Sequence, residues 1–344
     1  MANIVVCADG TWNRPEEDLE NDFPTNVLQL ARAISPETQE AKQHVFYDWG
    51  LGSYHNSLSA GATGAGIHKN ILDGYRYIVQ NYAPGDNIYL FGFSRGAYTV
   101  RALSGLINNC GILKRAEARL IVEAWKIYKS PTRTNHPAGK AACKFRADYS
   151  HPARDVHFIG VWDTVGALGI PFSIMGLFES HDEFYDTKMG ANVAIARHAL
   201  AIDEKREDFI PTIWTPRQGV DLKQVWFAGV HADVGGSYKP DKSGIQASDT
   251  PLAWMLDEAN AAGLITESHI RDNLTDGAKG QIHNSRKHVY RFKKPLDRPL
   301  VLDDTLMLIH PSVKARYERD ANYRPPYLKA LVEEYGWQGL TVGK

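Results

Sequence analysis

Cysteine is scarce in this sequence of 344 residues, which contains only Cys7, Cys110 and Cys143. Their number is odd and their spacing is wide, so they form neither a disulfide framework nor a four-cysteine metal site. A chain that does not depend on disulfides fits a reducing compartment. Its length is sufficient to bury a large hydrophobic core without covalent cross-links.

An excess of charge of either sign is also absent. The 39 Lys and Arg residues stand against 40 Asp and Glu residues, which gives a net charge of −1. This balance provides no general electrostatic basis for binding nucleic acid. No apolar run reaches the length of a transmembrane helix, and the run Ile4–Ala8 is too short, and lacks the basic flank, for a signal peptide. We therefore expect a cytoplasmic protein.

No internal repeat, low-complexity tract or linker divides the chain. Strand-like apolar runs alternate with helical periods, which predicts the α/β class: a doubly wound, mostly parallel sheet with helices on both faces, as in α/β-hydrolases. We expect a single domain over residues 1–344, with 129–154 and 168–190 as insert or lid segments. The apolar stretch 168–178 fits a lid or acyl-pocket wall as well as it fits core.

The apolar patterns predict the individual elements. Strands are expected within residues 4–8, 44–47, 88–91, 155–166, 225–230 and 288–292, and helices within 26–34, 67–82, 97–107, 114–128, 191–204 and 252–262. Thr25 is a candidate cap for the first helix, and Ser312 for a helix near the C-terminus.

The strongest motif is the pentapeptide Gly92-Phe93-Ser94-Arg95-Gly96. An apolar run precedes it and apolar residues at helical spacing follow it, so it occupies a sharp turn between a strand and a helix. In α/β-hydrolases this turn is the nucleophile elbow, which presents a serine hydroxyl above the sheet. Ser94 is therefore the candidate nucleophile, although an ordinary serine in a βα loop would give the same five letters.

Acid and histidine candidates follow the serine in chain order. Asp163 comes at the end of a predicted strand, where a hydrolase triad carries its carboxylate, or where it could cap the next helix. His231 follows a later strand and completes the order Ser, Asp, His. His310 is the rival histidine, because in many α/β-hydrolases the base follows the last strand. His231 and Asp233 could instead ligate a metal, but the usual ligand spacing is missing, so we expect no metal.

A turn after the first strand, Asp9-Gly10-Thr11, would lie at the same edge of the sheet. We expect backbone N–H groups of Gly10 or Thr11, together with that of Arg95, to form an oxyanion hole facing Ser94. A phosphatase motif with a nucleophilic Asp is the alternative, but it requires an acid two residues before Asp9, where Cys7 stands.

Several stretches together resemble a known family: VVCADGTWN, GATGAG, PGDNIYLFGFSRGAYTVRALSGLI, VWDTVGALG, RHALAIDEKREDF, VWFAGVHADVGGSY and IHPSV. The chain resembles an α/β-hydrolase family that includes the catalytic domains of phospholipase effectors from bacterial type VI secretion systems. The resemblance implies a triad of Ser94, Asp163 and His231, a lipid ester substrate, transient contact with a membrane surface, and export without a signal peptide as an option.

The function expected from these residues is hydrolysis of carboxylic esters through an acyl-enzyme, with no cofactor and no nucleic-acid partner. Two alternatives stay open: an esterase for small soluble esters, and a catalytically silent hydrolase fold that serves as a binding module. The sequence leaves the oligomeric state undetermined.

Overall fold

The structure is a computed structural model. It describes residues 1–10, 13, 15–18, 20–39, 41–50, 64–165, 189–300 and 307–340. Two predicted features, Thr11 and the apolar stretch 168–178, lie outside these residues.

In the described part of the chain, seven strands form one sheet in the order β2-β1-β3-β4-β5-β6-β7. Every neighbouring pair is parallel, which confirms the predicted parallel sheet. The strands are β1 (Ala2–Ala8), β2 (Lys42–Asp48), β3 (Asn87–Phe93), β4 (Val156–Trp162), β5 (Val193–Ala201), β6 (Asp221–Phe227) and β7 (Met307–Ile309).

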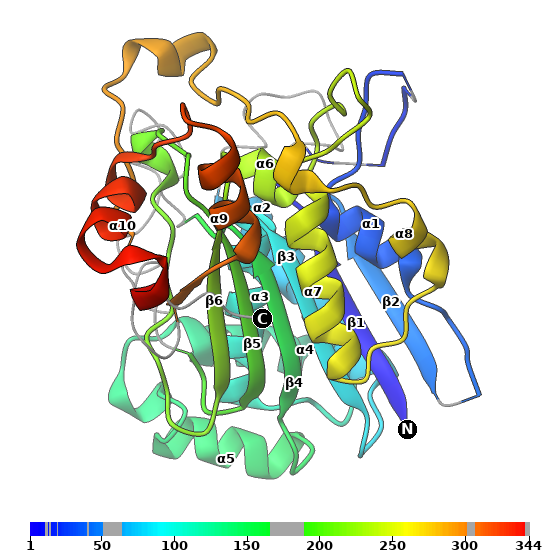
Figure 1. The fold of residues 1–344 in the computed structure, drawn as a ribbon. Coiled ribbons are helices and arrows are strands. Elements are labelled where there is room, and N and C mark those ends of the chain that lie inside the picture. Colours follow the sequence, from blue (N-terminus) through cyan, green and yellow to red (C-terminus); the bar gives the residue numbers. More distant parts are fainter. Residues whose placement is uncertain are drawn as a thin grey trace.

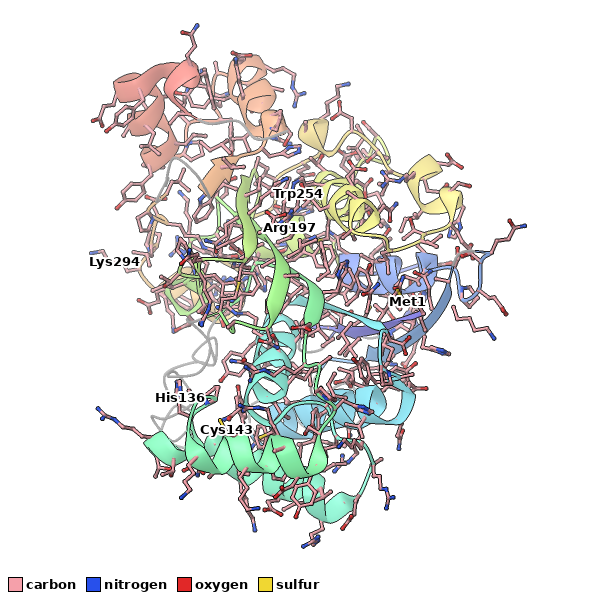
Figure 2. The ribbon with its side chains drawn as sticks, turned by 90° about the horizontal axis from the view of Figure 1, so that it is seen from below. Met1, His136, Cys143, Arg197, Trp254 and Lys294 are labelled. Atoms are coloured by element: carbon pink, nitrogen blue, oxygen red, sulfur yellow. The ribbon has the colours of Figure 1, made fainter. Side chains whose placement is uncertain are left out.

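Helices cover both faces of the sheet (Figure 1). One face carries α2 (Gly64–Asn81), α3 (Arg95–Cys110), α4 (Ala118–Lys129) and α5 (Lys140–Tyr149), and the other carries α1 (Asn26–Ala33), α7 (Asp249–Ala261) and α8 (Ser268–Asp272). Figure 2 shows these layers on opposite sides of the strands, with Trp254 on α7 and Cys143 on α5. A third apolar cluster joins β5, β6 and β7 to α9 (Pro311–Arg319) and α10 (Pro326–Gly339).

The remaining helices of the described residues are short. They are α6 (His231–Gly235), η2 (Arg133–Asn135), η5 (Glu207–Phe209), η6 (Gly277–Lys279) and η7 (His288–Phe292).

Local sequence explains much of this arrangement. β3 is buried along nearly its whole length, as expected for an apolar strand covered on both faces. α1 begins after Thr25, whose Oγ1 accepts a hydrogen bond from the Leu28 N–H at 3.1 Å, so the predicted cap is confirmed. The cap of α9 is instead His310, whose Nδ1 accepts from the Ser312 N–H.

The helix predicted over residues 191–204 is wrong, because this stretch contains β5. Its alanines favour a helix by local propensity. The surroundings decide otherwise: β5 lies between β4 and β6, and its last six residues are all buried. Hydrogen bonding to two neighbouring strands outweighs a weak local preference.

The predicted final strand 288–292 is also wrong, since these residues form the 3₁₀ helix η7, and the last strand is β7. The segment 129–154, predicted as a surface insert, contains α5. That helix buries Ala142 and Phe145, and Phe145 belongs to the apolar cluster of α2, α3 and α4, while Lys140 and Lys144 are exposed. The segment is thus partly structural, and the charges of Lys140 and Lys144 face solvent.

Strand order identifies the edge of the sheet where a site is expected. β1 pairs with β2 on one side and with β3 on the other, so the direction of winding reverses between β1 and β3. Ligands of doubly wound sheets bind beyond the carboxyl ends of the strands at such a point. Asp9 follows β1 and Ser94 follows β3 at this place.

Candidate active site

The turn around Ser94 is sharp and strained. Ser94 has φ 56° and ψ −121°, an unfavourable conformation for a residue with a Cβ. A Cβ on Gly92 would lie 2.5 Å from the carbonyl oxygen of Gly96, and a Cβ on Gly96 would lie 2.1 Å from that of Ala8. Only glycine fits at either position, because β1, β3 and α3 approach so closely here. The pentapeptide therefore forms the predicted strand–turn–helix elbow.

Asp163 and His231 are joined by a short hydrogen bond. Asp163 follows β4 directly, and His231 is the first residue of α6. The distance from His231 Nδ1 to Asp163 Oδ2 is 2.6 Å, and both side chains are buried. Asp163 also has a positive φ, 38°. The structure thus brings together the predicted acid and the preferred histidine, which are 68 residues apart in the chain.

A third side chain, Arg298, holds Asp163 from the other side. Its two terminal nitrogens donate to the two carboxylate oxygens at 2.7 and 3.0 Å, a bidentate pair buried from solvent. The Ala201 N–H adds a bond to Oδ1 at 3.0 Å. Burial would raise the pKa of Asp163, but the charge of Arg298 and the bond to His231 outweigh it and hold that pKa well below its ordinary value.

The ionised state of Asp163 fixes the tautomer of His231. Because the carboxylate can only accept, His231 Nδ1 carries the proton and Nε2 is left as an acceptor. Burial lowers the pKa of His231, although Asp163 opposes that shift. The imidazole is therefore neutral at neutral pH, as a general base must be.

The ring of His231 is held between two aromatic side chains. Phe93 lies 4.6 Å from it and Phe209 lies 4.9 Å from it, measured between ring centroids. The backbone N–H of His231 donates to Glu204 Oε2 at 3.2 Å. Glu204 is fully buried and also accepts from Arg206 and from the Ser285 hydroxyl.

Ser94 directly follows Phe93 in the chain, and the Phe93 ring packs on that of His231. The Ser94 N–H donates to the Trp162 carbonyl at 3.1 Å, which connects the elbow to the strand that ends at Asp163. Ser94 is 9% exposed. Within the described residues no hydrogen bond joins Ser94 to His231. Catalytic hydrogen bonds are often formed only when substrate is bound.

The loop after β1 lies beside the elbow, because a Cβ on Gly10 would be 3.3 Å from Ser94 Cβ. The Gly10 N–H, however, donates to Asp9 Oδ1 at 2.7 Å. A role for Gly10 as an oxyanion donor would require that bond to be released. Burial raises the pKa of Asp9 to about 6, although Thr25 and Tyr47 donate to its Oδ2 at 2.6 Å each. Asp9 thus holds the loop together. Arg95, the other predicted donor, is the first residue of α3.

His310 lies outside this arrangement. Its Nδ1 bonds with Ser312, and its ring stacks on Phe227 with 4.6 Å between centroids. Burial lowers the pKa of His310 to about 4. Asp233 accepts from His283 Nδ1 at 2.6 Å, so Asp233 and His231 have different partners instead of sharing a ligand.

Sequence patterns missed Arg298 and Glu204. Arg298 lies in an irregular segment 135 residues after Asp163, and nothing local marks it. Glu204 lay at the end of the mispredicted helix. Its place soon after β5, at the same edge as Asp163, would have been the signal had the strand been recognised.

Among the described residues, no group of three or more His, Cys, Asp or Glu side chains is arranged to hold a metal ion. The same part of the chain contains no helix that is long and apolar enough to span a membrane.

Comparison with known proteins places the chain in a family. Residues 2–258 match the family model described as T6SS, Phospholipase effector Tle1-like, catalytic domain. The uncharacterized protein YEL023C of Saccharomyces cerevisiae is 26% identical over 237 residues, which are 62% of this chain and 33% of that protein.

Two solved structures are also similar. An uncharacterized protein from Pseudomonas aeruginosa gives a TM-score of 0.43 at 15% identity, over 78% of this chain and 47% of that one. The Tle1 effector bound to the VgrG spike of the type 6 secretion system gives 0.37 at 18% identity, over 70% of this chain and 51% of that one. This chain therefore spans about a third of the curated relative and about half of each solved chain.

The family match covers well over half of the chain and includes Ser94, Asp163 and His231. The protein belongs to the family of Tle1-like phospholipase effector catalytic domains of type VI secretion.

Proposed function

We propose that the protein is a serine ester hydrolase that cleaves phospholipids, with Ser94 as nucleophile, His231 as general base and Asp163 as the acid that orients the histidine. The observation that carries this proposal is the 2.6 Å bond between buried Asp163 and His231, next to a strained serine turn. Strain and a buried charged pair cluster at functional sites more often than elsewhere.

The reaction follows the usual steps of a serine hydrolase. Ser94 Oγ attacks the carbonyl carbon of the ester while its proton passes to His231 Nε2. Collapse of the tetrahedral intermediate breaks the ester bond, and the departing alcohol takes that proton from His231. A water molecule then attacks the acyl-enzyme, again losing its proton to His231, and the fatty acid leaves as Ser94 recovers its proton.

Each supporting residue has a defined part in these steps. Asp163 stabilises the imidazolium that forms at His231. Arg298 keeps Asp163 ionised and fixed in place through its two hydrogen bonds. The N–H of Arg95, at the amino end of α3, would stabilise the oxyanion.

A phospholipid substrate is favoured over a small soluble ester by the family and by the charge near the serine. Arg95 directly follows the nucleophile. Burial lowers the pKa of its guanidinium only to about 10, so it is still cationic at neutral pH. If its guanidinium faces the substrate, this cation would suit an ester that carries a phosphate group.

The test is hydrolysis of a defined phospholipid, with products identified by mass spectrometry. Ser94→Ala should abolish release of fatty acid and lysophospholipid while its thermal unfolding stays like that of the parent. Ser268→Ala, which removes an exposed hydroxyl on α8, is the matched control and should keep full activity. Equal turnover by the parent and Ser94→Ala would refute the proposal. Turnover of short soluble esters alone would instead favour the soluble esterase.

A further inference from the structure

Residues 286–296 form a segment that is both basic and aromatic, here called the basic segment. Its sequence is RKHVYRFKKPL, and it contains η7. η7 is the orange turn that projects above the carboxyl ends of the strands in Figure 1. Phe292 is 79% exposed, and Leu296 is 38% exposed. Exposing an aromatic side chain this fully is unfavourable in water unless something covers it.

The positive charge of the basic segment is only partly neutralised. Lys293 pairs with Asp208 at 2.6 Å. Lys287, Arg291 and Lys294 are exposed and have no acidic partner among the described residues. The Arg291 guanidinium lies over the Phe292 ring at 4.6 Å, and Lys294 lies at the margin of the molecule in Figure 2. In a chain with a net charge of −1, this is a local excess of positive charge.

The basic segment is built onto the candidate active site. Tyr290 packs edge-on against Phe209 with 6.0 Å between centroids, and Phe209 packs against His231. The chain just before the segment bonds to Glu204 through the Ser285 hydroxyl at 2.7 Å. Just after it, Arg298 binds Asp163. A surface bound to the segment is therefore held close to the catalytic histidine.

Internal bonds give the segment a defined shape. The Arg286 side chain donates to the carbonyl oxygens of Lys293 and Arg291, which closes the segment on itself around η7. The Leu296 N–H donates to the Lys205 carbonyl at 2.9 Å, which ties the end of the segment to the chain after β5. Phe292 is thus presented from a braced loop instead of a freely moving chain.

We propose that the basic segment is a docking surface for membranes that contain anionic phospholipids. Lys287, Arg291 and Lys294 would contact lipid phosphates, and Phe292 would insert among the headgroups. This inference rests on the proposed phospholipase function, which it extends by naming the physical form of the substrate, a charged lipid surface. Exposed aromatic and basic side chains side by side are the features that bind an interface of this kind.

A membrane fits these features better than RNA does. Binding of single-stranded RNA relies on aromatic rings stacked on bases along a basic groove. Here the exposed Phe292 ring ends the projecting turn η7, whose Tyr290 packs on Phe209 beside His231.

The test compares two sets of variants on phosphatidylcholine vesicles with and without phosphatidylglycerol. The first set is Phe292→Ala, and the triple variant Lys287→Gln, Arg291→Gln and Lys294→Gln. The matched controls are Val122→Ala, an exposed apolar residue on α4, and the triple variant Lys126→Gln, Arg133→Gln and Lys140→Gln, which removes three exposed cations near α4 and α5. Turnover of a short-chain soluble ester is measured for all of them.

The parent should bind anionic vesicles, and added salt should weaken binding because it screens exposed charges. The basic-segment triple variant should bind on the order of 100-fold more weakly, and Phe292→Ala roughly 10-fold more weakly. Both should hydrolyse vesicle lipid more slowly while turning over the soluble ester like the parent. The controls should match the parent in every assay.

Equal vesicle binding by the parent and both basic-segment variants would overturn the proposal. So would binding of a single-stranded RNA that depends on these cations, with no binding to vesicles. Vesicle binding is measured in the Ser94→Ala background as well. If the protein cleaves no ester but binds anionic vesicles through these residues, the catalytic proposal fails while the docking surface stands.

Discussion

Removing the guanidinium of Arg298 is the perturbation with the most specific consequence. Arg298→Met keeps much of the side-chain volume and deletes both hydrogen bonds to Asp163. The carboxylate is then left buried and, among the described residues, keeps hydrogen bonds to His231 and the Ala201 N–H alone. Breaking one side of a buried ion pair destabilises a protein by about 3–5 kcal/mol. The variant should therefore unfold at a clearly lower urea concentration than the parent.

The effect on activity has its own signature. In the parent, the positive charge of Arg298 offsets the negative charge that Asp163 presents to His231. Without it, the carboxylate stabilises the imidazolium more strongly, so the pKa of His231 should rise. Because the neutral imidazole is the active form, the acid limb of kcat/KM should move to higher pH by the same amount.

The assay is the pH profile of ester hydrolysis, measured at a temperature where the variant is fully folded. Arg298→Lys is the conservative comparison: it keeps the charge but loses the bidentate geometry, so its acid limb should stay near that of the parent while its stability falls. If Arg298→Met loses stability and leaves the acid limb in place, Arg298 is a structural residue only and the reasoning about His231 is wrong.

Two further sets of variants test the packing of the turn around Ser94 and the loss of stability at low pH. Gly96→Ala should destabilise the fold by more than about 3 kcal/mol, because the new Cβ would lie 2.1 Å from the Ala8 carbonyl oxygen. Gly85 is the comparison: its φ is +100° and no atom lies near a new Cβ, so Gly85→Ala should destabilise the fold by about 1–2 kcal/mol. Similar melting temperatures for the two would contradict this contrast. His310→Asn should reduce acid sensitivity. Below pH 6.5, the ordinary pKa of histidine, His310 becomes protonated in the unfolded chain. In the folded protein its pKa is about 4, so it stays neutral there, and protonation favours the unfolded state. As the pH falls from 6.5 to about 4, the free energy of unfolding of the parent should decrease by up to about 3 kcal/mol more than that of the variant. If urea unfolding shows the same pH dependence of stability for both proteins, this prediction is wrong.

The features predicted well from sequence are those that local chemistry specifies. The two glycines around Ser94 mark a turn that only glycine permits, and the apolar run of β3 marks a buried strand. The positions of Asp163 and His231 after strands predicted that the two side chains lie close together, since parallel strands bring their carboxyl ends to one edge, and they are hydrogen-bonded.

The features that sequence did not predict depend on contacts far apart in the chain. β5 is rich in alanine and becomes a strand only between its neighbours. β7 is three residues long, too short for a periodic pattern, while the β-favouring residues of 288–292 form η7. Arg298 lies in an irregular segment, and its bond to Asp163, 135 residues away in the chain, can be recognised only in the folded structure.

The most direct test of the catalytic account is labelling with a fluorophosphonate, which reacts with an activated serine. The parent should label, Ser94→Ala and His231→Ala should not, and His310→Ala should label like the parent. Loss of labelling in His310→Ala with retention in His231→Ala would contradict the assignment of the base. If the folded parent is not labelled by the fluorophosphonate, either in solution or in the presence of lipid vesicles, the assignment of Ser94 as a nucleophile is contradicted.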